Sequence, residues 1–104
     1  MTPRLTSIVG LTGLMLSTGP FSAQASAIEN ACLSSERGSG QSILCGCIQD
    51  AADQTLTKGD QKLAATFFSN PQRAQDIRQS SRRHHERFWE RYEAFGEVAQ
   101  AFCR

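Results

Sequence analysis

The stretch that decides the fold class is RRHHERFWERYEAFGEVAQAFC, which covers residues 82–103. Apolar residues recur in it at steps of four, three, four and three, close to the 3.6-residue period of an α-helix. These residues are Phe88, Tyr92, Phe95, Ala99 and Phe102. The pattern predicts a helix from about residue 82 to residue 102 that packs this aromatic stripe into the core. Gly96 lies near the stripe, where its missing side chain would let another helix approach.

The residues before this stretch also show helical periodicity, and they contain no alternating strand pattern. We expect helices over about 28–35, 42–56 and 58–69. The last of these begins at a capping box, in which the Thr57 hydroxyl accepts a hydrogen bond from an amide near Asp60. The sequence therefore predicts an all-α fold, a small bundle of three to five helices.

The boundary before residues 82–103 is less sharply marked. Asn70 and Pro71 can start a helix, because Asn caps and Pro fits the first helical position. Ser80 and Ser81 favour a break before the last helix, although one continuous helix from Pro71 stays open. In the helix over 42–56, Gln49 is expected on the polar, solvent-facing side.

The first 27 residues have the features of a signal peptide. Arg4 supplies a positive start, residues 8–16 are mostly apolar, and Ala25-Ser26-Ala27 has the small residues of a cleavage site. The apolar run is about half the roughly 20 residues that a membrane span needs. We predict cleavage after Ala27, a periplasmic or secreted location, and one helical domain over 28–104. The mature chain would have 77 of the 104 residues, with no membrane span and no net charge.

All four cysteines, Cys32, Cys45, Cys47 and Cys103, lie in the mature chain. An even number of cysteines in a small exported protein predicts disulfides, here two. Four cysteines allow three pairings, and spacing does not choose among them. The two pairings without a Cys45–Cys47 bond are favoured, because helical side chains two residues apart point away from each other.

The sequence contains few motifs that would indicate catalysis or cofactor binding. A Cys45–Cys47 bond would suggest an alternative function, a thiol–disulfide redox protein, but the Cys-x-x-Cys motif of thioredoxins is missing. His84 and His85 point about 100° apart on a helix and do not chelate a metal together. We therefore expect no metal, no cofactor and no catalytic residue, and an enzyme is the less favoured class.

The main charge asymmetry lies in residues 73–91, which hold six arginines against three acidic residues. Guanidinium groups suit carboxylate and phosphate partners, so this segment is a candidate contact for an acidic protein or an anionic surface. The candidate residues are Arg73, Arg78, Arg82, Arg83, Arg87 and Arg91. Local ion pairs such as Arg83 with Glu86 would instead make the segment an ordinary solvated face. Nucleic acid is not expected as a partner, because the mature chain is neutral.

Several motifs together resemble those of small exported proteins of alphaproteobacteria that have four cysteines. The matching stretches are Cys32-x12-Cys45-Gly46-Cys47-Ile48-Gln49, residues 52–56 (Ala-Asp-Gln-Thr-Leu), Asp60-Gln61, Phe67-Phe68-x-x-Pro71, Phe88-x-x-x-Tyr92 and Cys103. The resemblance implies an exported protein with a shared helical fold. Members sometimes carry the label "arginine transporter", but 77 residues without a spanning helix do not build a transporter or a two-lobed solute receptor. We expect a non-enzymatic interaction or structural module.

Overall fold

The computed structural model describes residues 26–104, and the described part contains five helices and no strand. The helices are α1 (Ala27–Ser34), α2 (Ser42–Thr55), α3 (Lys58–Ser69), α4 (Pro71–Arg78) and α5 (Arg83–Phe102). The predicted all-α bundle of three to five helices is confirmed. Residues 1–25, which hold most of the predicted signal peptide, lie outside the described residues, so that peptide and its cleavage stay predictions.

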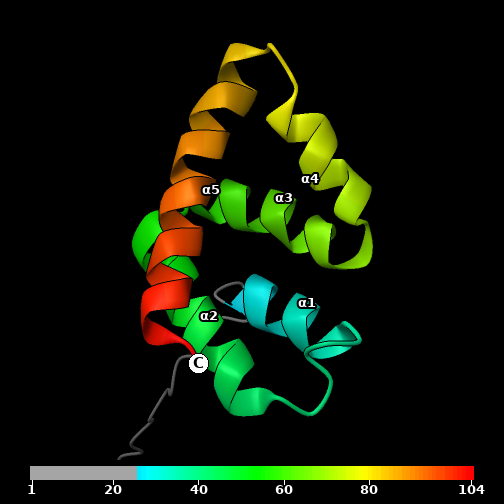
Figure 1. The fold of residues 1–104 in the computed structure, drawn as a ribbon, viewed down its shortest axis with the longest axis vertical. Coiled ribbons are helices and arrows are strands. Elements are labelled where there is room, and N and C mark those ends of the chain that lie inside the picture. The colour runs from blue at the N-terminus through cyan, green and yellow to red at the C-terminus, as the bar shows by residue number, and fades with distance from the viewer. Residues whose placement is uncertain (1–25) are drawn as a thin grey trace, which may run out of the picture.

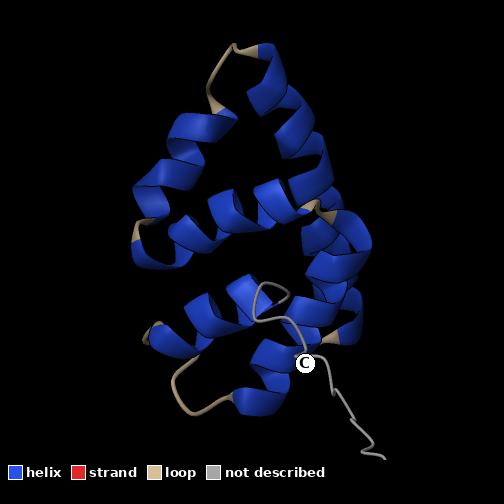
Figure 2. Cartoon of the chain, turned by 180° about the vertical axis from the view of Figure 1, so that it is seen from behind, coloured by secondary structure: helices blue, strands red, loops and turns tan. Residues whose placement is uncertain are grey.

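The helices form two connected parts (Figure 1). α4 and α5 make an antiparallel hairpin, and α3 crosses beneath it and packs against both of its helices. α1 lies below α3 and packs against α2 and α3, while α2 packs against the carboxyl-terminal half of α5. Figure 2 shows the turn between α4 and α5 at the apex of the molecule, far from α1 and α2.

Local signals explain where the helices begin and end. The Thr57 hydroxyl accepts from the Asp60 amide at 3.0 Å, and the Asp60 carboxylate accepts from the Thr57 amide at 3.1 Å, so the predicted capping box is present. Pro71 is the first residue of α4. The predicted break before α5 is also confirmed, since α4 ends at Arg78 and α5 starts at Arg83.

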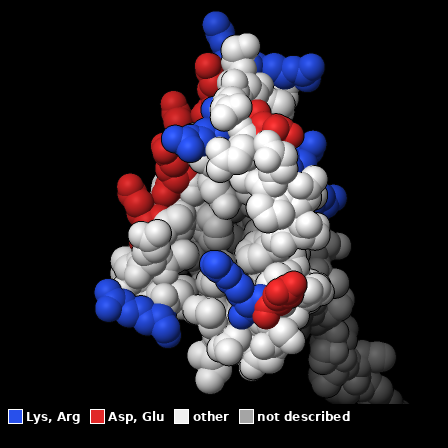
Figure 3. Space-filling view, turned by 45° about the vertical axis from the view of Figure 1, so that its right-hand side comes forward, with Lys and Arg blue, Asp and Glu red and all other residues white. Residues whose placement is uncertain are grey.

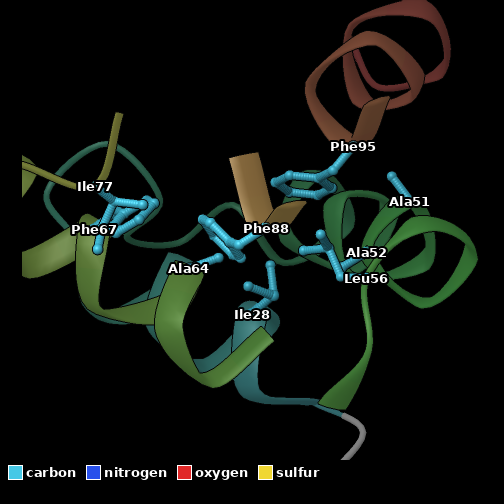
Figure 4. Packing of buried hydrophobic residues seen from close by; sticks show 9 residues of the cluster. All are labelled: Ile28, Ala51, Ala52, Leu56, Ala64, Phe67, Ile77, Phe88 and Phe95. Atoms are coloured by element: carbon cyan, nitrogen blue, oxygen red, sulfur yellow. The ribbon is translucent and has the colours of Figure 1, made fainter. Parts of the chain in front are cut away.

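A cluster of nine buried residues forms the core (Figure 4), and all five helices and the connection after α2 contribute to it. Its members are Ile28, Ala51, Ala52, Leu56, Ala64, Phe67, Ile77, Phe88 and Phe95. The Phe67 ring of α3 packs in a T-shaped arrangement with Phe88 at 5.9 Å and with Tyr92 at 5.2 Å between ring centroids. Burial of these aromatic rings contributes more to so small a core than the alanines around them.

The aromatic stripe is confirmed at Phe88 and Phe95, but the prediction for its last member is wrong. Phe102 is 77% exposed. A strict heptad drifts about 20° around a straight helix with each repeat, so the stripe has turned by about 40° between Phe88 and Phe102. The neighbouring Cys103 is the residue that faces α2 there. The expectation for Gly96 is also wrong, because no atom outside its own helix lies within 4 Å of where its Cβ would be.

Gln49 is buried, at 4% exposure, and the prediction that it faces solvent is wrong. Gln49 is buried because its side chain bonds to the start of α1, where the first backbone amides have no hydrogen-bond partner within the helix. The Glu29 amide donates to Gln49 Oε1 at 2.9 Å, and Gln49 Nε2 donates to Gln61 Oε1 and Asp53 Oδ1, each at 2.8 Å. A buried side-chain amide of α2 thus satisfies the end of another helix, and its own donors are satisfied in turn.

Two disulfides link the elements, and both differ from a Cys45–Cys47 bond. Cys32 of α1 is bonded to Cys45 of α2, and Cys47 of α2 is bonded to Cys103 after α5. The Cα atoms are 5.6 Å and 5.7 Å apart, within the usual range for disulfides. The first bond is buried, whereas both cysteines of the second are partly exposed. The pairing that spacing left open is therefore sequential along the chain.

The loop between α1 and α2 passes close to the first disulfide. A side chain at Gly38 would overlap the Cys32 carbonyl, so only glycine fits there. Gly40 has φ of +77°, in the left-handed region where glycine is favoured. These two glycines let the chain reverse tightly enough to bring Cys45 back onto Cys32.

Candidate anion-binding surface

The cysteines do not form a redox site of the kind that the alternative function requires. Cys45 and Cys47 lie on different sides of α2, and each is bonded to a cysteine of another segment. No cysteine among the described residues is free. A dithiol pair that cycles between open and closed forms at Cys45-Gly46-Cys47 is therefore absent from this fold.

Residues 26–104 were also compared with the requirements of a metal cluster and of a membrane-spanning helix. This part of the chain has no group of three His, Cys, Asp or Glu side chains placed to hold a metal ion. None of its helices combines the length and the apolar composition of a membrane span. A surface hollow of about 400 Å³ beside Ala31, Phe68 and Ser69 has only Glu36 as a titratable group.

The predicted arginine segment occupies the projecting hairpin. Five of its six candidates are exposed, and we call them the hairpin arginines. They are Arg73 and Arg78 on α4, Arg82 in the turn, and Arg83 and Arg87 on α5. Figure 3 shows basic side chains at the apex, with a row of acidic side chains down one side below it. The hairpin therefore presents five guanidinium groups, of which those of Arg78, Arg82 and Arg83 belong to residues at or next to its turn.

The sixth candidate, Arg91, has a different role. Its Nε donates to Asp60 Oδ2 at 2.6 Å and its Nη2 donates to Asp60 Oδ1 at 3.0 Å, so the pair is bidentate. The Arg91 hydrogen bonds lower the pKa of Asp60, against the opposing effect of burial. Arg91 thus ties α5 to the capped start of α3. Chain spacing gave no signal for this pair, because its members are 31 residues apart.

The hairpin arginines have no such partners. The Arg91–Asp60 pair is the one ion pair within 4.0 Å among residues 26–104. Glu86 and Glu90 lie on the same helix as Arg83 and Arg87, but the local pairs that would neutralise this face are not formed. The guanidinium groups therefore stay available to groups outside the chain.

The positions of Arg82 and Arg83 oppose the dipole of α5. The amino end of a helix carries a partial positive charge, so basic residues there are unfavourable by a few tenths of a kcal/mol each. Arg82 is the N-cap residue of α5, and Arg83 and the two histidines follow it. Glu86 is the acidic residue of that turn, and the N-cap side chain accepts no hydrogen bond. Such a local conflict, which Glu86 offsets only in part, is typical of functional positions.

A serine organises the turn between the helices. Ser80 Oγ accepts a hydrogen bond from the Arg82 amide at 3.2 Å and shares one of 2.7 Å with His85 Nδ1. Partial desolvation, together with His84, Arg82 and Arg73, lowers the pKa of His85. The hydrogen bond with Ser80 therefore holds the His85 ring against the turn.

Comparison with known proteins adds no further assignment: no family model, curated protein or solved structure gives a significant match to this chain.

Proposed function

We propose that this protein is a non-enzymatic interaction module whose hairpin arginines bind an acidic protein surface. The observation that carries the proposal is the set of five exposed arginines without a carboxylate partner in the described chain, two of them at the amino end of α5. Guanidinium groups form bidentate bonds with carboxylates, as Arg91 does with Asp60 inside this molecule. The same chemistry is open at the hairpin for a partner's Asp and Glu side chains.

An acidic protein fits the hairpin better than a membrane or a nucleic acid. Helices that bind bilayers usually insert large apolar side chains beside their basic residues. Among the described residues, the exposed large apolar side chains are Ile43 and Phe102, which lie at the other end of the molecule. A long polyanion would also meet the exposed glutamates of α5, and its affinity depends on many simultaneous phosphate contacts.

The proposed compartment is the periplasm or the outside of the cell. Two disulfides in a small domain are compatible with an oxidising environment. The predicted signal peptide over 1–27 and the resemblance to exported four-cysteine proteins support the same location. Intact mass of the exported protein, with and without reduction before alkylation, tests both parts: cleavage after Ala27 and four cysteines protected until reduction are expected.

Binding to an oligoglutamate peptide tests the proposed function. A triple variant with Arg78→Gln, Arg82→Gln and Arg83→Gln removes three charges from the hairpin. The matched control, with Arg37→Gln, Lys58→Gln and Lys62→Gln, removes three charges from exposed positions elsewhere. We expect the hairpin variant to bind the peptide about tenfold more weakly at low salt, and the control to bind nearly as the parent does.

Two results would contradict the proposal. Equal losses in the hairpin and control variants would mean that net charge, and not the hairpin, governs binding. Binding to phosphatidylglycerol vesicles without binding to oligoglutamate would assign the hairpin to a lipid surface instead. Circular dichroism of each variant checks that the helices are intact.

A further inference from the structure

Two adjoining hollows lie beside the carboxyl ends of α1 and α3. The two helices run in the same direction (Figure 1), and their last residues, Ser34 and Ser69, both line the smaller hollow. Its volume is about 400 Å³ and that of the larger hollow is about 730 Å³, both in the range of small-molecule sites. Ser35, Glu36 and Phe68 line both hollows. We call the two hollows together the α1–α3 groove.

Two serine hydroxyls in the smaller hollow have already used their protons. Ser35 Oγ donates to the Cys32 carbonyl at 2.6 Å, and Ser69 Oγ donates to the Thr66 carbonyl at 3.3 Å. A hydroxyl has one proton to donate and two lone pairs that accept. One lone pair of Ser35 accepts from the Gly38 amide at 3.1 Å, which leaves the other. Each hydroxyl therefore offers a ligand an acceptor and no donor.

The other groups of the smaller hollow favour positive charge. Glu36 is the one titratable residue in its lining; this side chain is exposed and forms no ion pair within residues 26–104. The carboxyl end of a helix carries a partial negative charge, and neither α1 nor α3 has a basic residue in its last turn. The Phe68 ring adds a π face, which attracts cations. The smaller hollow is therefore suited to a positively charged hydrogen-bond donor.

The larger hollow has a more apolar lining. Leu44, Ile48 and Pro71 line it together with Phe68. Arg37 also lines it and repels positive charge, so a cationic group fits the smaller hollow better than the larger one. An apolar group attached to that cation can pack on Phe68, Leu44 and Ile48, where its surface is removed from water.

We propose that the α1–α3 groove binds a small organic cation, a primary ammonium compound with an apolar body. An ammonium group has three donors and no acceptor. It donates to the Glu36 carboxylate and to the Ser35 and Ser69 hydroxyls, while the apolar body packs on Phe68 and extends into the larger hollow. An anion is disfavoured in the smaller hollow, because these hydroxyls have no proton to give it and Glu36 repels it. This site is separate from the hairpin arginines and takes a ligand of opposite charge.

An NMR titration of the isotope-labelled protein with phenethylammonium tests the inference. Hydrocinnamate is the matched ligand, because it has the same ring on a short chain and carries a negative charge. We expect phenethylammonium to shift the amide signals of Ser35, Glu36 and Ser69. Hydrocinnamate should leave these signals nearly unchanged.

Variants of the charged residues test the role of Glu36. Glu36→Gln should bind phenethylammonium about threefold to fivefold more weakly at low salt, because an exposed carboxylate contributes modestly to an ion pair. Glu93→Gln removes the same charge from an exposed position on α5 and should bind as the parent does. Arg37→Gln should bind equally well or more tightly, since it removes a like charge from the groove. Circular dichroism checks that each variant keeps its helices.

Four results would overturn the inference. The first is the absence of any shift with phenethylammonium, and the second is a set of shifts confined to residues outside the groove. The third is equal binding of hydrocinnamate, which would mean that the ring and not the charge is selected. The fourth is an equal loss in Glu36→Gln and Glu93→Gln, which would mean that net charge attracts the ligand. None of these results concerns the hairpin, whose binding to oligoglutamate is measured separately.

Discussion

At the α1–α2 end of the molecule, buried polar groups have partners: Gln49 and Gln61 bond to each other, to Asp53 and to the backbone. On the α4–α5 hairpin, five arginines have no ion-pair partner in the described chain. The first end also holds the buried disulfide, whereas the apex is held by α3 from below and by a short turn. Buried polar groups with partners and exposed arginines without ion-pair partners therefore lie in different parts of the described chain, and substitutions in each part should act differently.

The largest expected effect is in the core that both ends share. Replacing Phe95 by Ala should lower the free energy of unfolding by about 3–5 kcal/mol, because a large buried ring is lost and leaves a cavity. That loss approaches the whole stability of a small domain, so both ends should unfold together. Urea denaturation followed by circular dichroism measures it. Phe102→Ala is the control on the same helix, since that ring is 77% exposed, and it should change stability by less than about 0.5 kcal/mol.

A parent-like melting temperature for Phe95→Ala would contradict the packing of α5 against α2. The aromatic stripe would then have to be assigned to a binding surface instead of the core.

The next effect compares the two disulfides. Chain entropy predicts about 4 kcal/mol for the Cys47–Cys103 bond, whose partners are 56 residues apart, and about 3 kcal/mol for Cys32–Cys45, 13 residues apart. Replacing both cysteines of one bond by Ala, followed by thermal unfolding, measures each. Removal of the buried bond also leaves a cavity, so we expect its loss to equal or exceed the entropy value. A negligible change for the long-loop bond would show that α5 is held by its apolar contacts alone.

A smaller effect is expected at the ion pair between the two ends. Asp60→Asn removes the charge that caps α3 and bonds Arg91, and should destabilise by about 1–2 kcal/mol, reduced because Arg91 is partly exposed. Since folding lowers the pKa of Asp60, this stabilisation is complete above about pH 4 and is lost as the pH falls through the lowered value. The unfolding free energy of Asp60→Asn should therefore depend less on acid pH than that of the parent. Asp50→Asn, at an exposed site, should not change that dependence.

The smallest effect has the opposite sign. Arg82→Gln and Arg83→Gln remove positive charge from the amino end of α5, so they should leave stability unchanged or raise it by up to about 0.5 kcal/mol at low salt. The gain should disappear at high salt, because the interaction is exposed and screened. A clear destabilisation by either change would mean that the arginine has a structural partner. That result would weaken the contrast between the two ends.

Sequence periodicity and local signals were sufficient for the helices. The Thr57 capping box, Pro71 and the serines at 80–81 gave three boundaries, because these signals act within a few residues. Features that depend on distant contacts could not be predicted in the same way. The polar Gln49 is buried because its side chain accepts a hydrogen bond from the Glu29 amide at the start of α1. Arg91 differs from the other arginines of its segment because the fold brings Asp60 within hydrogen-bonding distance of it.

The candidate site was predicted as a segment and not as a geometry. Six arginines in residues 73–91 indicated an anionic partner. The three-dimensional structure was needed to show that Arg91 is paired with Asp60 and that the other five have no ion-pair partner among the described residues. The hydrogen bond between Ser80 and His85 depends on the conformation of the turn. Amino-acid composition does not predict that conformation.

The sequential pairing of the cysteines has a consequence for the order of events during biogenesis. If the chain enters the proposed oxidising compartment amino end first, Cys32 and Cys45 arrive before Cys103, so the first native bond can close before the partner of Cys47 is present. Cys47 must then stay a free thiol until the last helix arrives, and its thiolate is two residues from a disulfide that it could attack. Packing of α1 on α2 removes that bond from solvent, with Cys32 at 3% and Cys45 at 0% exposure. Early packing of α1 on α2 would therefore protect the Cys32–Cys45 bond from exchange until Cys103 reaches the Cys47 thiol.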